Sequence, residues 1–420
     1  MKRYGMIFWG CLLIMGFIFL SGVQAAEKEK TITVGLSLVY TGGMAPNGSS
    51  TSNGLLDHLM WINNQGGIEY KDPGTRKLER MKMKVIWEDN AANPAKGMSV
   101  YKRLKAAGAM VIFGYASTPM EVISSSLSRD KIPGFAMYAF ASPAGYRPEP
   151  RYYAAACGTG IEGVATAVKW FLSRWKESRP ARIGAFVLDL PSWRIIGDPE
   201  GTKAYAERMG AQWLGVEWLP PVVTDTSVQI SRMMKQGVDC ISLIGVIPTT
   251  IVVAKDLARL GVDLNKVTVV SHPAGWDESL LKIIPREGEG LYGEIMTATP
   301  EEDVPGVRLA KELAQWRGRK PEEVNSTYIP GVGLGYLMKA AIKIALEKAG
   351  ADKITPTDIR DALFNMKNVD VGGLMPPVTV DEPDYPIIGL NYVRYTRIEG
   401  GKMKVISDWV KREKVQYGRK

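Results

Sequence analysis

The stretch TITVGLSLVYTGG at residues 31–43 is the most informative part of the chain for its fold. Its first eight residues, Thr31–Leu38, are rich in β-branched and apolar side chains, which indicates a buried strand, and Thr41 and Gly42 provide a turn after it. A helical pattern follows at 54–64, and a second strand-like run lies at 81–87. This alternation predicts a parallel sheet whose strands are connected by helices.

The same alternation continues through two successive series of elements. The first series runs to a strand expected at 134–137, and the second begins after Cys157 and ends near residue 284. The last part of the chain differs, because helical patterns are followed by two strand-like runs around Gly400 and Gly401, which predict a hairpin. Helices are expected, among other places, at 119–129, 277–284, 304–316, 325–348 and 355–364, and the hairpin strands at 391–396 and 402–407. We expect an α/β protein with two lobes and a ligand cleft between them.

The first 26 residues have the features of a secretory signal peptide. Lys2 and Arg3 form a cationic start, residues 6–20 are apolar and uncharged, and small residues precede a cleavage point after Ala25 or Ala26. A retained membrane anchor is the alternative, because the uncharged stretch is just long enough to span a bilayer. Removal of residues 1–26 would leave a mature protein outside the cytoplasm.

The composition excludes several classes of protein. The 420 residues include only 2 His and 3 Cys, too few for a His-rich metal site or a disulfide scaffold, and we expect no metal or cofactor. The formal charge of +9 comes from basic residues interspersed with acidic ones, so no nucleic-acid partner is expected. The basic run at 411–414 is expected to be a solvated tail. Cys157 and Cys240, which lie beyond the signal peptide, either form a disulfide or remain two buried thiols.

Several motifs, taken in order, carry a family resemblance. After the opening strand come INNQGGI at 62–68, VIWEDN at 85–90, VIFGYAST at 111–118, Ile132-Pro133 leading to Ala141-Ser142-Pro143, and the helix expected from Tyr328 to Ala341. This order resembles the branched-chain amino-acid-binding proteins, which are periplasmic receptors of ABC importers. The resemblance implies a two-lobed type I periplasmic binding fold. In that fold each lobe is a mostly parallel sheet flanked by helices, and three hinge crossovers connect the lobes.

The resemblance also implies a domain division and a function. Lobe 1 would comprise residues 27–157 and 298–372, and lobe 2 residues 158–297 and 373–420. The protein would be a monomer that captures an amino acid or a related small organic acid between its lobes. It would then deliver this ligand to an ABC permease in the inner membrane.

On the first lobe, two loops are candidates for holding the ligand carboxylate. Ser117 and Thr118 follow a strand, and Thr118 before Pro119 is a natural N-cap, so the simpler interpretation is a plain helix cap. In the resembled family this loop holds the carboxylate, with the helix end behind it. The second loop, with Ala139, Phe140 and Ser142, would supply backbone groups and a hydroxyl.

On the second lobe, Trp193 stands where the family carries an aromatic residue that covers the ligand, and surface packing is its alternative role. Ala274 stands at the position of the acid that recognises the ligand ammonium group, and Ile247 lies where the family has an aromatic hydroxyl. Both of these differences from the family favour a ligand acid that is less polar than an amino acid. His272 and Trp276 are then further candidates for the cleft, and packing within their loop is the alternative role of each.

A secreted α/β enzyme is the main rival class, and its motifs are missing. No Gly-x-Ser-x-Gly elbow surrounds Ser117, and GVGLG at 331–335 lacks the dinucleotide-binding spacing. We therefore do not expect an enzyme. A receptor of the same fold that senses its ligand for a signalling partner is the remaining alternative.

Overall fold

The computed structural model describes residues 30–138, 150–158, 160–380 and 389–415. The first of its two sheets has six strands in the order β2-β3-β1-β4-β5-β6. These strands are β1 (Thr31–Leu38), β2 (Ile68–Lys71), β3 (Leu78–Asp89), β4 (Val111–Gly114), β5 (Gly134–Tyr138) and β6 (Tyr153–Cys157). All neighbouring pairs are parallel except β2 with β3. The carboxyl ends of β1, β4, β5 and β6 therefore meet at one edge of the sheet.

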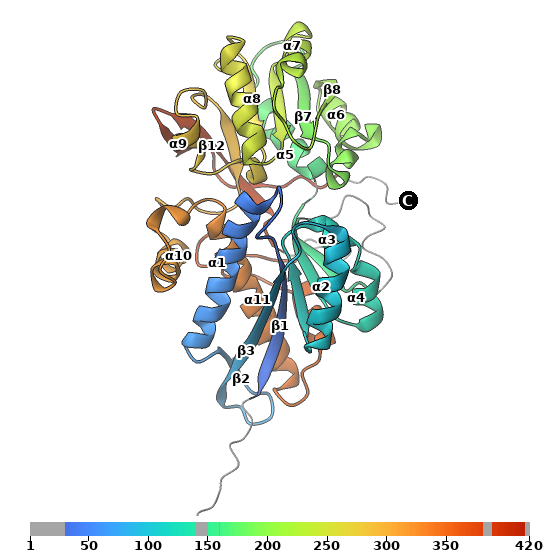
Figure 1. Cartoon of the computed structure of the whole chain (residues 1–420), viewed down its shortest axis with the longest axis vertical. Helices are drawn as coiled ribbons and strands as arrows, with labels where there is room; N and C mark the ends of the chain where they lie inside the picture. The colour runs from blue at the N-terminus through green and yellow to red at the C-terminus, as the bar shows by residue number, and fades with distance from the viewer. Residues whose placement is uncertain (1–29, 139–149, 159, 381–388, 416–420) are drawn as a thin grey trace, which may run out of the picture. The chain divides into compact units, whose positions relative to one another are not determined.

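Helices cover both faces of this sheet because its central strands are apolar on both sides. Val34 and Leu36 of β1 belong to the large core cluster with Leu55 of helix α1, whereas Ile112 of β4 packs in a second cluster with Leu104 of α2. Figure 1 shows α1 and α11 along one side of β1 and β3, and α2, α3 and α4 on the other. The helices of this part are α1 (Ala45–Asn64), α2 (Pro94–Ala106), α3 (Ser117–Glu121), α4 (Ser124–Asp130), α10 (Pro305–Trp316), α11 (Tyr328–Ala349) and α12 (Pro356–Phe364).

The second sheet has the order β13-β12-β11-β10-β9-β7-β8, and β14 also pairs with β12. Its strands are β7 (Arg182–Leu188), β8 (Gln212–Leu219), β9 (Cys240–Ile244), β10 (Thr268–Ser271), β11 (Tyr292–Ile295), β12 (Tyr392–Glu399), β13 (Lys402–Val405) and β14 (Val410–Lys411). Strands β7 to β11 are parallel to one another where they pair, and β12 is antiparallel to β11 and β13. The hairpin predicted around Gly400 and Gly401 is confirmed, since Glu399 pairs with Lys402.

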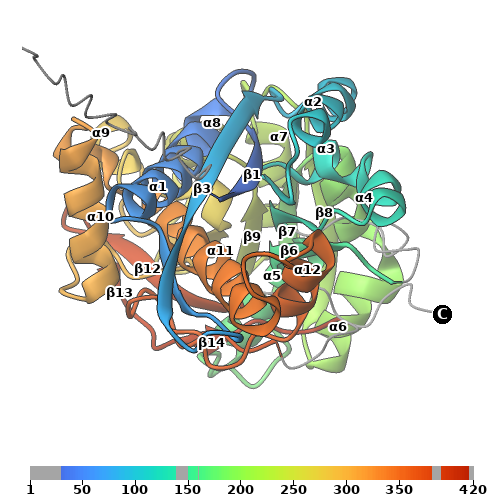
Figure 2. The same ribbon diagram turned by 90° about the horizontal axis from the view of Figure 1, so that it is seen from below.

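Helices flank the second sheet as well. In Figure 2, α7 (Ser227–Lys235) and α8 (Ile247–Arg259) lie on one side of β7 and β9, and α5 (Gly160–Leu172) and α6 (Ala204–Arg208) lie on the other. The predicted two-sheet α/β architecture is thereby confirmed. In the order of the described elements, the chain changes from one part to the other three times: between β6 and α5, between β11 and α10, which packs on α1, and between α12, which packs on α11, and β12.

Some predicted elements were wrong in detail. The helix expected at 119–129 is broken into α3 and α4, and the helix expected at 277–284 is reduced to α9 (Leu280–Ile283). Strands β2, β6 and β11 were not predicted. Strand β2 alternates between buried and exposed residues but has only four, and β6 and β11 are similarly short and show no alternation. Cys157 and Cys240 are two separate buried thiols, which resolves the alternative left open by the sequence.

The motif GVGLG at 331–335 lies inside α11, where the glycines permit close helix packing. A Cβ atom on Gly331 would lie 2.8 Å from the backbone nitrogen of Leu55 in α1. A side chain on Gly335 would overlap the imidazole of His58. Of the helices in the described part of the chain, α11 alone is long and apolar enough to cross a membrane. Its buried packing against α1 accounts for that apolar composition.

Candidate functional site

The loop after β4 carries the first predicted ligand residues. Ser117 is the first residue of α3 and is nearly buried, and Thr118 is half-buried. The prediction that Thr118 caps the helix was wrong. Ala116 occupies the N-cap with an extended backbone, so the helix begins two residues earlier and Thr118 lies within its first turn. Since α3 has only five residues, its dipole is weak, and the two hydroxyls are the groups that this loop offers.

The predicted residues Ala139, Phe140 and Ser142 lie outside the described residues. Tyr138, which immediately precedes them at the end of β5, was not predicted. Its ring lies 6.0 Å from the ring of Tyr115 and 5.9 Å from the imidazole of His272, measured between centroids. Because His272 follows β10 of the second sheet, Tyr138 and His272 mark a contact between the two sheets' carboxyl edges.

Trp193 lies on the same side as His272. It belongs to the short 3-10 helix η2 (Pro191–Gly197) that follows β7, and it is 9% exposed. Its ring is 6.5 Å from the imidazole in an edge-on arrangement. Gly160, at the start of α5, lies beside the indole, since a Cβ there would be 3.6 Å from Cδ1 of Trp193. Tyr138, His272 and Trp193 thus form one aromatic cluster with contributions from both sheets.

The imidazole of His272 is neutral and has a defined tautomer. The backbone N–H of Ala274 donates to its Nδ1 at 3.3 Å, so the ring proton is assigned to Nε2. Burial, helped by the positive charge of Arg412, lowers the pKa of His272 to about 3. His272 therefore offers one N–H donor and no charge.

The remaining predicted residues are Ala274, Ile247 and Trp276. Ala274 is buried in the turn after β10, and Ile247 is buried at the start of α8. Trp276 was wrongly expected in the cleft. Its indole N–H donates to Oγ1 of Thr396 at 2.7 Å, and the ring packs over Gly293, which leaves no room for a side chain there. Trp276 is consequently a core residue of the second sheet.

Asp277 and Glu278 follow Trp276 in the sequence, and both carboxylates accept hydrogen bonds from other groups of the protein. The Ser279 hydroxyl and N–H donate to Asp277, and Thr327 donates to its other oxygen at 3.4 Å. Glu278 accepts from the N–H of Ser326 at 2.8 Å and from its hydroxyl at 2.7 Å. Burial raises the pKa of both carboxyls, that of Glu278 to about 7. These acids connect the loop after β10 to the segment that precedes α11.

A buried ion pair lies beside His272 and was missed by the sequence analysis. Arg412 was expected in a solvated tail, but its side chain is only 7% exposed. Pairing of β14 with β12 holds it inside, and its Nη1 is 4.0 Å from Oε2 of the buried Glu294. The only available signal was the apolar context of Trp409 and Val410 just before it.

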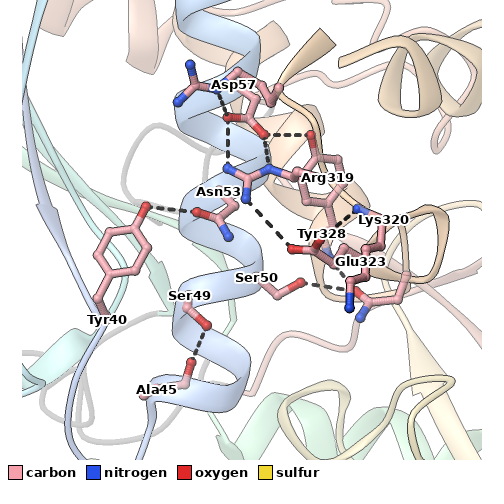
Figure 3. Close-up of polar contacts among 12 residues, drawn as sticks. Tyr40, Ala45, Ser49, Ser50, Asn53, Asp57, Arg319, Lys320, Glu323 and Tyr328 are labelled. Carbon is pink, nitrogen blue, oxygen red and sulfur yellow. Dashed lines mark hydrogen bonds and ion pairs between the residues drawn. The ribbon is translucent and has the colours of Figure 1, made fainter. Parts of the chain in front are cut away.

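A second ionic cluster joins α1 to the segment before α11. In Figure 3 the carboxylate of Asp57 lies between guanidinium groups and the hydroxyl of Tyr328. Arg317 Nε and Arg319 Nη2 each donate to Oδ1 at 3.0 Å, and Tyr328 donates to Oδ2 at 3.0 Å. All these donors bind one fully buried acid, so the cluster positions α1 rather than offering a site. Among the described residues, no group of three or more His, Cys, Asp or Glu side chains could hold a metal.

Comparisons with known proteins agree with this architecture. The sequence model of the family described as periplasmic binding protein matches residues 31–400. No curated relative matches the chain significantly by sequence.

Solved structures share the fold at low identity. A branched-chain amino acid ABC transporter protein from Thermus thermophilus with bound valine is 17% identical and has a TM-score of 0.75. The match covers 91% of this chain and 97% of that one. A fatty acid ABC transporter substrate-binding protein from Thermomonospora curvata is 20% identical, with a TM-score of 0.73 and coverage of 91% and 93%.

A solute-binding protein of an ABC transporter from R. palustris, in complex with 4-hydroxybenzoate, is 20% identical, with a TM-score of 0.71 and coverage of 93% and 98%. At these identities the likeness establishes the fold alone. The family match extends over most of the chain and therefore decides its identity. This chain belongs to the periplasmic binding protein family.

Proposed function

We propose that this protein captures a small organic acid with an apolar body between its two lobes and delivers it to an ABC permease. The aromatic cluster of Tyr138, His272 and Trp193 carries this proposal, because rings from both sheets meet at the carboxyl edges of the strands. Such edges are where ligands of α/β proteins bind. An apolar or aromatic ligand body would pack against these rings.

The polar groups nearby favour an acid over an amino acid. The hydroxyls of Ser117 and Thr118 and the Nε2–H of His272 are donors, which suit a carboxylate. Recognition of an ammonium group would require an acceptor, and Ala274 provides only a methyl group. The acids that follow, Asp277 and Glu278, are already hydrogen-bonded to Ser279, Thr327 and Ser326.

The ligands of the similar structures are compatible with this class. One of these structures contains valine, one contains 4-hydroxybenzoate, and one is described as a fatty acid transporter protein. Each of these three compounds or compound classes has a carboxylic acid group. Their apolar parts differ widely. The carboxylate is the shared feature that we carry over to this chain.

Capture would require no covalent chemistry. Lobe 1 would comprise residues 27–157 and 298–372, lobe 2 residues 158–297 and 373–420, and the ligand would stabilise the closed arrangement by contacting both. The monomeric protein would act in the periplasm after removal of residues 1–26. The closed form would then dock on its permease.

A thermal-shift screen of the mature chain tests the ligand class directly. Acids with apolar bodies, such as 4-hydroxybenzoate, benzoate and octanoate, should raise the melting temperature more than leucine or valine does. The neutral amide of each acid is the matched control and should produce a smaller shift. A largest shift with leucine or valine would contradict the argument from Ala274.

A further inference from the structure

Arg412 is a buried cation whose hydrogen-bonding capacity is not satisfied. Its backbone N–H donates to the carbonyl of Asn391 at 2.8 Å, which fixes the residue beside β12. Its side-chain atoms Nε and Nη2 are buried and have no hydrogen-bond partner among the described residues. A guanidinium that is removed from water without partners costs several kcal/mol. Some other group is therefore expected to complete this site.

Glu294 does not complete the site. Its Oε1 accepts from the hydroxyl of Tyr395 at 3.2 Å, and its Oε2 lacks a hydrogen-bond partner among the described residues. The 4.0 Å between Oε2 and Nη1 of Arg412 is longer than a hydrogen bond. Burial, only partly opposed by Arg412, raises the pKa of Glu294 to about 7. Glu294 therefore supplies no direct hydrogen-bonded partner for the guanidinium of Arg412.

The donors of Arg412 and His272 converge beside α5. A Cβ atom on Gly163 would lie 3.6 Å from Nε2 of His272 and 3.8 Å from Nη1 of Arg412. Both donors therefore lie within about 4 Å of one point. Gly163 is the fourth residue of the 13-residue helix α5, so this point is close to the positive end of the helix dipole. The ring of Tyr138 contacts the same imidazole from the first sheet.

We propose that Arg412 and His272 form a subsite that binds the carboxylate of the ligand, at the second-sheet side of the aromatic cluster. This inference rests on the proposed function and specifies it, because the guanidinium selects an anion and repels an ammonium group. The carboxylate accepts hydrogen bonds from the guanidinium and from Nε2–H of His272. The apolar body of the ligand lies against Tyr138 and Trp193.

The test compares acids with their amides, which lack the carboxylate charge. The probes are 4-hydroxybenzoate with 4-hydroxybenzamide, octanoate with octanamide, and leucine with leucinamide, measured by titration calorimetry on the mature chain. The wild-type protein should bind at least one acid tenfold or more tightly than its amide. Arg412→Met, which keeps the volume but not the charge, should lose at least tenfold in affinity for that acid and little for the amide. Folding of this variant is favoured because Glu294 can take up a proton.

Arg394→Met is the matched control. Arg394 is a similarly buried arginine of β12, but its guanidinium pairs with Glu302, so its replacement should leave the affinity for the acid unchanged. Gly163→Ala is the second test variant, and it applies even if Arg412→Met does not fold. Its methyl group would narrow the space between the two donors and should also weaken acid binding at least tenfold.

The outcomes separate the two proposals. If the wild type binds an acid and Arg412→Met or Gly163→Ala binds it equally well, the Arg412 subsite is wrong and the proposed function stands. If the wild type binds no acid of the panel, or binds acids and amides equally, both proposals fail.

Discussion

Gly54 of α1 and Gly331 of α11 face each other where the two helices cross. A Cβ atom placed on Gly331 would lie 3.1 Å from Cα of Gly54, and one placed on Gly54 would overlap the carbonyl oxygen of Tyr328. The backbones are therefore in direct contact at this crossing. Because α1 follows β1 and α11 comes from the late part of the chain, this contact attaches the late helices to the first sheet.

Substitution at this crossing should destabilise the protein strongly. Gly54→Ala or Gly331→Ala would force the helices apart, and we expect a loss of about 2 to 4 kcal/mol in the free energy of unfolding, as for overpacked cores. Urea titration followed by circular dichroism measures this loss. Gly333→Ala is the control on the same helix, since its nearest contact would be an ordinary 3.7 Å, and helix propensity should make it neutral or slightly stabilising. Equal losses in the free energy of unfolding for Gly331→Ala and Gly333→Ala would contradict the close packing of α1 on α11.

The buried carboxylate of Asp57 should contribute several times more to stability than an exposed one. Asp57→Asn removes the negative charge that Arg317 and Arg319 share and replaces one of the two acceptor oxygens by an NH2 donor, and we expect a loss of about 3 kcal/mol in the free energy of unfolding. The control is Asp303→Asn, which removes an exposed ion pair with Arg308 and should cost less than about 1 kcal/mol. Similar losses for both variants, measured by urea titration, would refute the structural role of Asp57.

Glu278 should make stability depend on pH. The folded protein holds the proton of this carboxyl more tightly than the unfolded chain does, since burial raises its pKa from 4.5 to about 7. Its contribution to the free energy of unfolding therefore falls as the pH rises from about 4.5 to about 7, by up to about 3 kcal/mol.

The measurement compares the wild type with Glu278→Gln across this pH range. The difference in stability, wild type minus variant, should decrease steadily between pH 4.5 and 7 and be constant below pH 4. This comparison removes the contributions of His58, His272 and Glu294, which both proteins share. A difference that does not change with pH would show that Glu278 keeps an ordinary pKa in the folded state.

Ligand affinity should depend on Ser117 and Trp193. Loss of the hydroxyl in Ser117→Ala, or of the indole in Trp193→Ala, should each weaken binding of the best acid from the screen by about 1 to 3 kcal/mol. Titration calorimetry gives this change. Ser99→Ala and Trp316→Ala, which alter exposed positions on α2 and α10, should leave the affinity unchanged. Unchanged affinity in both test variants would exclude this placement of the ligand.

The sequence predicted most of the regular architecture because strand and helix periodicities are local. The strand Thr31–Leu38 has the same bounds in the structure, and the hairpin at Gly400 lies where its glycines indicate. The helix 119–129 was predicted wrongly because the break between α3 and α4 depends on packing against α2 and β5. Helix propensity depends on the local sequence and does not reflect such tertiary contacts.

The candidate site was less predictable because it depends on distant segments. Tyr138 and Arg412 are far apart in sequence, and neither carries a motif. Arg412 in particular lies in a basic run that resembles a solvated tail, and only the pairing of β14 with β12 buries it. In contrast, the family resemblance made Trp193 and His272 candidates, and the structure places them after β7 and β10.

The position of β12 near the end of the sequence has a consequence for the chain while it is being synthesised. Strands β7 to β11 are complete at residue 295, but their antiparallel neighbour begins only at Tyr392, after three helices that belong to the other sheet. Until residues 392–411 have left the ribosome, β11 presents an unpaired edge, which is a template for association with other chains. A product shortened by premature termination or proteolysis before Tyr392 should therefore aggregate rather than persist as a half-functional receptor.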